Sequence, residues 1–395
     1  MSGGQLLVGT GVTIGVAGIA TFRTGRIDVG DSLENTSVGE DAGDANTTGS
    51  SNVSIGYRAL TTNTTGSNNV AVGRESLYAN TTASNNTAVG LYALNSTTTG
   101  DSNVAIGRGA LEDNTGSQNV AVGRDALEEN TTGTRNIAVG SYALEANTTA
   151  DDNVAVGYEA LEENTTGSEN TAVGSNTLDS NTTGDNNTAV GAGVLQSNTT
   201  ADNNTAVGRR AMYLNTTGAN NTALGAYALD ANTTGSFNTA LSRSALGANT
   251  TGGQNTAVGY GALLANTTAN DNTAVGNWAL QANTTGNQNV GVGNSALTAN
   301  TTGVQNTAIG VFALDAATTA SYNTAVGRGA LSSNTTGAQN IAIGVNSLVL
   351  NTTGTDNTAC GRSALANNTT GSKNTAVGRG ALDSNTTADL SLIHI

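Results

Sequence analysis

Carboxylates are the residues of this 395-residue chain whose types and spacing first suggest chemistry. Acidic pairs stand at Glu112-Asp113, Glu128-Glu129 and Glu162-Glu163, and Glu145 lies between the last two pairs. Two carboxylates on one face could serve glycoside hydrolysis or bind a cation. The glycine-spaced aspartate loops of calcium sites do not accompany them, so we interpret the group as a solvated acidic ridge.

A nucleophilic centre is not indicated. It would need a base beside its Ser or Cys, and the single histidine, His394, lies in the last six residues. The single cysteine, Cys360, stands where neighbouring repeats carry Ile343 and Val377, so we expect a small core residue. We therefore predict no enzyme activity, no catalytic residue, no cofactor and no metal site.

Aromatic side chains could instead contact a ligand, because their rings stack on sugars or pack against a receptor. Tyr158, Tyr260 and Trp278 are the candidates for surface contacts, and they lie at predicted turns. Aromatics are irregular from repeat to repeat, so scattered surface residues without a shared role are the alternative.

Composition limits the class of protein. The chain has 14 basic and 29 acidic residues, a net charge of −15 and a single Lys, Lys373, which argues against a nucleic-acid partner. It has 52 Gly, no Pro and 3% aromatics, too few large apolar residues for several globular cores. The uncharged run Gln5 to Phe22 is broken by glycines and predicts neither a signal peptide nor a membrane span.

A 17-residue repeat must position these residues. The unit Asn-Thr-Ala-Val-Gly-x-x-Ala-Leu-x-x-Asn-Thr-Thr-Gly-x-x occurs 21 times, with first residues from Asn35 to Asn374. We number its positions 1 to 17. Position 1 is always Asn, position 5 is Gly in 20 copies and position 9 is Leu in 19. Charges fall only at positions 6, 7, 10, 11, 16 and 17.

The unit has two short apolar runs, Ala-Val-Gly and Ala-Leu, which predict two short strands per repeat. Seventeen residues are too few for two helices with their turns. We therefore predict an all-β fold, a parallel β-solenoid of about 21 coils with one coil per repeat. Identical residues would stack, with Asn103 and Asn153 in side-chain ladders and Leu127 and Leu280 at the repeated apolar position.

Glycine at position 5 predicts a positive φ or a close backbone approach. Gly73, Gly107, Gly157 and Gly276 stand at this position, and Ser242 is the exception. Either the coil of Ser242 is strained, or the position needs only a small side chain. Position 15 accepts Ala in six copies and therefore requires no special conformation.

Strand alternation suggests a partner chain. Val104 and Ile106 face one side of their strand and Ala105 the other, and both sides are apolar or small. Because a solenoid has one interior, we expect a partner chain on the second face. Ala105→Glu and Ala155→Glu should then dissociate the oligomer. The alternative is that Ala105 and its equivalents are small surface residues.

The ends lie outside the repeat. Residues 1–34 are expected to form a β cap or connector, residues 35–389 the repeat domain, and residues 390–395 a non-native tail that resembles a translated sequencing adaptor. The natural chain would then continue beyond residue 389, and a short divergent cap is the alternative. The connector has three candidate strands, at 12–14, 19–22 and 26–29.

The motif Ser102-Asn103-Val104-Ala105-Ile106-Gly107 resembles the head repeats of YadA-like trimeric autotransporter adhesins. The longer unit, with its Ala-Leu and Asn-Thr-Thr-Gly segments, resembles the repeat regions of phage tail fibres. The resemblance covers residues 35–389, although the unit is longer than in the adhesins. It implies a left-handed β-roll, a homotrimer, and an adhesive or spacer role on a virion or cell surface, where a host glycan or protein could be the receptor.

We therefore expect a structural fibre, most closely a tail-fibre repeat region that presents or spaces a host-binding element, with no membrane insertion of this segment. A secreted bacterial adhesin head is one alternative. A carbohydrate-active solenoid is another, although no carboxylate pair breaks the repeat pattern. An ice-binding solenoid is a third, and it could use stacked Thr rows such as Thr64, Thr81 and Thr98.

Overall fold

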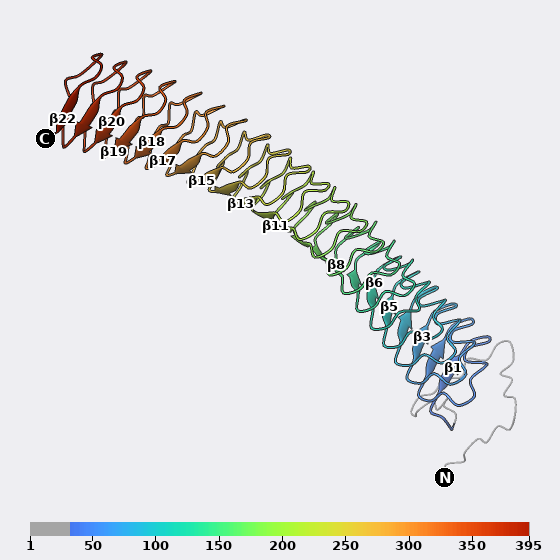
Figure 1. Cartoon of the computed structure of the whole chain (residues 1–395). Helices are drawn as coiled ribbons and strands as arrows, with labels where there is room; N and C mark the ends of the chain where they lie inside the picture. Colours follow the sequence, from blue (N-terminus) through green and yellow to red (C-terminus); the bar gives the residue numbers. More distant parts are fainter. Residues whose placement is uncertain (1–31, 395) are drawn as a thin grey trace, which may run out of the picture.

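The computed structural model describes residues 32–394 as an all-β rod of stacked coils, with one coil for each 17-residue repeat (Figure 1). The strands are β1 (Thr36–Val38), β2 (Val53–Ile55), β3 (Val70–Val72), β4 (Thr87–Val89), β5 (Val104–Ile106), β6 (Val120–Val122), β7 (Ile137–Val139), β8 (Val154–Val156), β9 (Thr171–Val173), β10 (Thr188–Val190), β11 (Thr205–Val207), β12 (Thr222–Leu224), β13 (Thr239–Leu241), β14 (Thr256–Val258), β15 (Thr273–Val275), β16 (Val290–Val292), β17 (Thr307–Ile309), β18 (Thr324–Val326), β19 (Ile341–Ile343), β20 (Thr358–Cys360), β21 (Thr375–Val377) and β22 (Leu392–His394).

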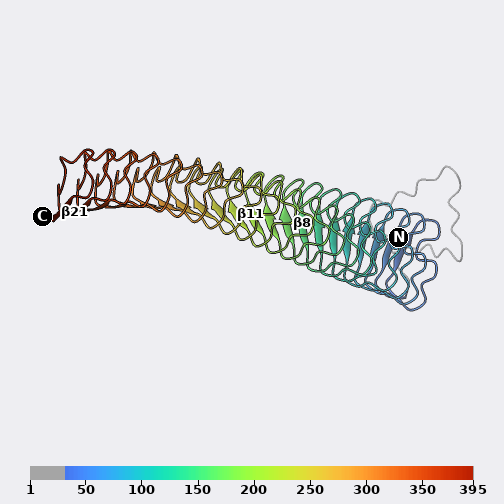
Figure 2. The ribbon, with the colours of Figure 1, turned by 45° about the horizontal axis from the view of Figure 1, so that its top comes forward.

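Each strand is parallel to the next, and equal positions of the unit lie opposite each other. Ala172 in β9 pairs with Ala189 in β10, for example, and Ala206 in β11 follows in the same row. The predicted β-solenoid with stacked identical residues is confirmed. The rod bends gently along its length (Figures 1 and 2).

The predicted second strand is wrong. The Ala-Leu segment lies in a turn, and the leucine at position 9 has a left-handed backbone, with φ 53° at Leu127 and 52° at Leu280. A strand cannot pass through this conformation. The coils stay bonded there all the same, because Leu127 N–H donates to the Ala143 carbonyl of the next coil at 3.0 Å.

The interior is built from alanine at positions 3 and 8 and leucine at position 9. Ala105 and Ala155 are fully buried, whereas Ile106 is 41% exposed. Assigning position 3 to a partner interface or to the surface was therefore wrong, and the valine and isoleucine side of the strand faces outward. The space inside the coil explains why alanine, and not valine, faces inward. At Gly291, a Cβ atom would lie 3.3 Å from Cδ1 of Leu280, so the leucine row leaves room only for a small residue.

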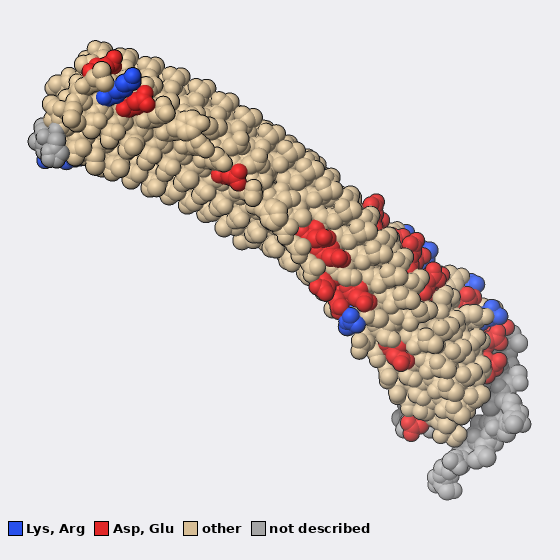
Figure 3. All heavy atoms as spheres, viewed as in Figure 1, with Lys and Arg blue, Asp and Glu red and all other residues tan. Residues whose placement is uncertain are grey.

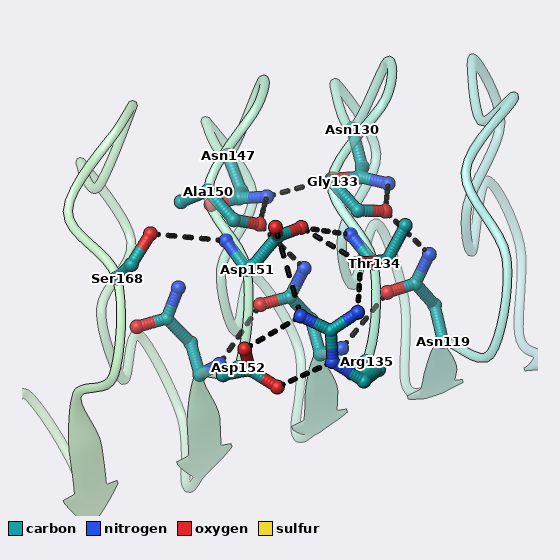
Figure 4. A network of polar contacts seen from close by, with 12 residues as sticks. Asn119, Asn130, Gly133, Thr134, Arg135, Asn147, Ala150, Asp151, Asp152 and Ser168 are labelled. Atoms are coloured by element: carbon teal, nitrogen blue, oxygen red, sulfur yellow. Dashed lines mark hydrogen bonds and ion pairs between the residues drawn. The ribbon is translucent and has the colours of Figure 1, made fainter.

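Two buried asparagine ladders run along the rod, at positions 1 and 12 (Figure 4). Asn119 and Asn130 of one coil both donate from Nδ2 to the carbonyl of Gly133, at 2.8 and 3.0 Å. Asn147 of the next coil donates to Asn130 Oδ1 at 2.6 Å, and Asn119 Oδ1 accepts the Asn136 N–H at 2.9 Å. Each amide thus bonds both within its coil and to a neighbouring coil, which explains why asparagine recurs.

The two asparagines that were predicted to lie in the position 1 ladder have equivalent partners in their own coils. Asn103 donates to the Gly116 carbonyl at 3.0 Å, and Asn153 donates to the Gly167 carbonyl at 2.9 Å. Both side chains are completely buried. The ladder prediction for position 1 is therefore confirmed.

Position 5 has the predicted positive φ. It is 136° at Gly73, 143° at Gly107, 145° at Gly157 and 132° at Gly276, and a Cβ atom there would collide with the next coil's backbone. Ser242 has φ 116°, so its coil carries the strain that glycine avoids.

The structure describes the C-terminal end of the chain, as far as residue 394, but not the N-terminal end. The candidate strands at 12–14, 19–22 and 26–29 lie outside the described residues. At the other end, β22 pairs with β21 in the common register, and Ser391 N–H donates to Asn374 Oδ1 at 2.9 Å. The backbone of the 390–395 segment, as far as residue 394, thus continues the stack.

Candidate functional site

The acidic ridge is a row of side chains at position 10, one on each of five successive coils: Glu112, Glu128, Glu145, Glu162 and Asp179. Figure 3 shows acidic side chains gathered on the N-terminal half of the rod, while the C-terminal half is largely uncharged in this view. The structure adds Asp125 and Glu159, from position 7, to this ridge. Sequence reasoning missed them because position 7 was not expected to lie beside position 10.

Partial burial, with a smaller contribution from neighbouring charges, raises the pKa values of the position 10 carboxylates. Partial burial, followed by the charges of Glu159, Asp179 and Glu145, raises the pKa of Glu162 from 4.5 to about 7. Burial is also the main cause of raised pKa values at other members of the row, namely Glu112, Glu128, Glu145 and Asp179. Glu162 is thus poised to take up a proton near neutral pH.

Glu159, Glu162 and Asp179 each place one carboxylate oxygen within 4.8 Å of the other two. Within residues 32–394, these three side chains are the group of acidic, His or Cys residues that lie close enough together to hold a metal ion. Exposed acidic groups of this kind are common without an ion. We therefore assign the ridge no ligand.

Asp125 is the buried member of the ridge. Its side chain is 7% exposed, and its Oδ2 lies 2.9 Å from Arg124 Nε and 3.8 Å from Arg108 Nη1. Its Oδ1 has no hydrogen-bond partner in the described structure. Two arginines on neighbouring coils thus compensate one carboxylate, which indicates a structural role.

The three aromatic candidates form two separate contacts. The Tyr158 ring is edge-on to Tyr142 at 6.1 Å between centroids, and Tyr158 is 50% exposed. Tyr260 and Trp278 meet edge-on at 4.6 Å. The indole lies over Gly261, where a Cβ atom would be 2.7 Å from its ring. The structure therefore brings Tyr260 and Trp278 together and leaves Tyr158 about six coils away.

The hydroxyl groups of the threonine rows already make hydrogen bonds between coils. Thr64 Oγ1 donates to the Thr81 carbonyl at 3.0 Å, and Thr81 Oγ1 donates to the Thr98 carbonyl at 3.3 Å. These hydroxyls bond coil to coil, and the rod bends, so position 13 does not offer a flat array of free hydroxyl groups to ice (Figure 2).

Cys360 is exposed, so its assignment to the core was wrong. It stands at position 4 of its coil, and position 4 points away from the interior. The prediction placed position 4 on the inner side of the strand, whereas the structure places position 3 there, and this difference explains the error.

The outer side of the sheet forms an apolar stripe, which we define as positions 2 and 4 of every coil from Thr36 to Val377. It contains Thr, Val, Ile and Leu, with one Cys, and no charged residue. Eleven of its apolar members are strongly exposed: Val38, Ile55, Val89, Ile106, Ile137, Val139, Val190, Leu224, Ile309, Ile341 and Ile343. Exposed Val, Ile and Leu side chains that recur along one face in this way are typical of interaction sites.

Within residues 32–394, no helix has the length and hydrophobicity that crossing a bilayer requires. Neither the known protein-family models nor the curated protein sequences include a match to this chain.

Proposed function

We propose that this chain is the repeat region of a surface fibre or adhesin, most closely that of a phage tail fibre, and that it works on a virion or cell surface as a non-catalytic fibre that presents or spaces a receptor-binding element. The observation that carries the proposal is the unbroken register of 22 parallel strands along one rod. Such a stack separates its two ends by about 100 Å at a strand spacing of about 4.8 Å.

The apolar stripe supports assembly into a homotrimer. A rod that exposes Ile106 and Val139 to water, along with their equivalents on other coils, leaves a long apolar face uncovered. Association of three copies through this face removes that surface from water. Because the stripe has no charge, it imposes no desolvation penalty on charged groups.

Sedimentation tests this assembly. The wild-type chain should sediment as a trimer, about three times 39.0 kDa. Ile106→Lys with Val139→Lys should give folded monomers, because ammonium groups cannot be buried in the apolar contact without a partner. Thr132→Lys with Thr166→Lys is the matched control, since both threonines are exposed at position 14.

Two results would contradict the assembly. One is a wild-type chain that sediments as a folded monomer, and the other is equal dissociation by the control variant. The surface role is tested separately, by adsorption of labelled wild-type chain to bacterial cells. A rod that adsorbs to no strain of a broad panel would contradict the receptor part of the proposal.

A further inference from the structure

The regular side-chain rows are interrupted at one point. Gly247 stands at position 10, between Asp230 and Leu264 of the adjacent coils, and it is the one glycine at this position among the 21 repeats. The missing side chain leaves an open hollow of about 500 Å³ on the surface of the rod. Its lining residues are Tyr227, Asp230, Ser244, Gly247, Ala248, Leu264 and Ala265.

Three polar side chains of the hollow make no side-chain hydrogen bond within the described structure, although the charge of Arg210, which is not among the lining residues, lies near Asp230. The carboxylate of Asp230 makes no hydrogen bond there, and its Oδ1 is buried. The Ser244 hydroxyl and the Tyr227 phenol also make no side-chain hydrogen bond to described residues. A buried acceptor without a donor is costly, so this surface favours a ligand that brings hydroxyl donors.

The remaining lining is apolar. Tyr227 contributes an aromatic ring, and the Arg209 and Arg210 guanidinium carbons lie 5.6 and 5.9 Å from its centroid. Leu264 and Ala248 contribute aliphatic surface. A ligand that fits must therefore have an apolar face together with hydroxyl groups around its edge.

We propose that the hollow over Gly247 binds a neutral pyranose ring. The C–H face of such a sugar packs on Tyr227 and Leu264, and its hydroxyl groups donate to Asp230 and exchange hydrogen bonds with Ser244. The carboxylate of Asp230 disfavours acidic sugars. Burial raises the pKa of Asp230, as expected for a carboxyl group that lacks donors. This assignment rests on the proposed surface function and adds a ligand class to it.

A second copy of the chain is a poorer occupant. A contact between parallel rods repeats at every coil, whereas this hollow occurs at one coil.

Saturation-transfer NMR with the full chain tests the proposal. The probes are free glucose, galactose, mannose, N-acetylglucosamine and N-acetylgalactosamine, with glucuronate as the acidic counterpart. At least one neutral sugar should bind, and glucuronate should bind more weakly than glucose. Tyr227→Ala and Asp230→Asn should each weaken binding by about tenfold or more, the loss of one stacked ring or one charge-assisted hydrogen bond.

Gly247→Leu is the decisive variant, because it fills the hollow with the residue that the next coil carries at Leu264. Its Cβ atom would lie 3.3 Å from Cδ1 of Leu264, a flexible side-chain end, and 3.4 Å from the Ser244 carbonyl oxygen, an ordinary contact, so the coil should still fold. Ser332→Leu, at position 10 of a distant coil, and Tyr92→Ala, at position 7, are the matched controls. The expected result is loss of sugar binding in Gly247→Leu and unchanged binding in both controls.

Several outcomes would overturn the proposal: no neutral sugar binds the wild-type chain, Gly247→Leu binds as well as wild type, or a control loses binding equally. A change in sedimentation caused by Gly247→Leu would show a contact between copies instead. If sugars fail to bind while the chain still adsorbs to cells, this inference is wrong and the proposed function stands. If both fail, the receptor role is wrong as well.

Discussion

Asn300 and Ala317 stand next to each other in the position 12 ladder, and the amide oxygen of Asn300 is buried without a hydrogen-bond donor because Ala317 has no amide to offer. In most other coils the next asparagine donates to this oxygen, as Asn300 itself donates to Asn283 Oδ1 at 2.8 Å. The same defect occurs at Asn80, whose neighbour in the next coil is Thr97. The buried unpaired oxygens of the ladder thus mark the coils where the repeat departs from asparagine.

Restoring the ladder should stabilise the rod. Ala317→Asn would donate to Asn300 and to the Ala320 carbonyl and would accept from Asn334, and we expect a gain of about 1 kcal/mol or more in local stability. Hydrogen exchange of the coils around residue 317 measures the gain. Ala316→Asn, at the neighbouring outward position, is the control and should change little. Faster exchange in Ala317→Asn would show that the ladder is not stabilising at this coil.

Ser242 offers a test of backbone strain. Ser242→Gly keeps the backbone at φ 116° and removes the Cβ atom, so it should stabilise its coil by about 1 kcal/mol. The measurement is again local hydrogen exchange. An unchanged or faster rate at residue 242 would mean that serine is accommodated there without strain.

Gly276→Val is the reverse experiment. It should raise hydrogen exchange in the coils beside residue 276 and leave the coils near Gly73 unchanged, because each coil contacts only its neighbours. Thr285→Val is the matched control, since Thr285 is exposed at position 14 of the same coil. Uniform loss of protection along the rod would show that the coils unfold as one unit.

The acidic row should make stability depend on pH. The folded-state pKa of Glu162, about 7, lies above its ordinary 4.5, so the folded chain holds a proton that the unfolded chain has already released. This contribution to stability is fully present below about pH 4.5 and is lost as the pH rises through 7. The coils from Glu145 to Asp179 should therefore exchange faster at pH 8 than at pH 5.5, after correction for intrinsic rates.

Glu162→Gln should reduce this dependence on pH. Glu169→Gln, which removes one charge from position 17 of the same coil, serves as the control. Protection that increases with pH in the wild-type chain would contradict the sign of the effect.

The repeat explains which parts of the fold were predictable. Position 1 asparagine and position 5 glycine follow directly from hydrogen-bonding capacity and from conformational freedom, so the ladders and the positive φ could be predicted. The left-handed leucine could not, because leucine has no preference for φ near 50°, and burial decides the conformation at Leu127. The side of the strand that faces inward was equally ambiguous, because alanine and valine are both apolar, and the leucine row decides in favour of alanine.

The candidate sites were less predictable. The repeat places Tyr260 and Trp278 one coil apart, but their contact depends on the empty space over Gly261, which residue types do not indicate. The hollow over Gly247 likewise arises from a missing side chain. A glycine that interrupts a row of larger residues is the sequence feature that could have indicated it.

The central claim is that each repeat is one coil of a rod, and the length of a shortened chain tests it most directly. Deleting residues 204–288, which form five whole coils, keeps the flanking repeats in register. It should shorten the rod by about 24 Å at about 4.8 Å per coil. Electron microscopy and small-angle scattering of the wild-type and shortened chains give this difference. We expect a rod of about 100 Å that loses about a quarter of its length. A compact particle, or loss of folded structure on deletion, would contradict it.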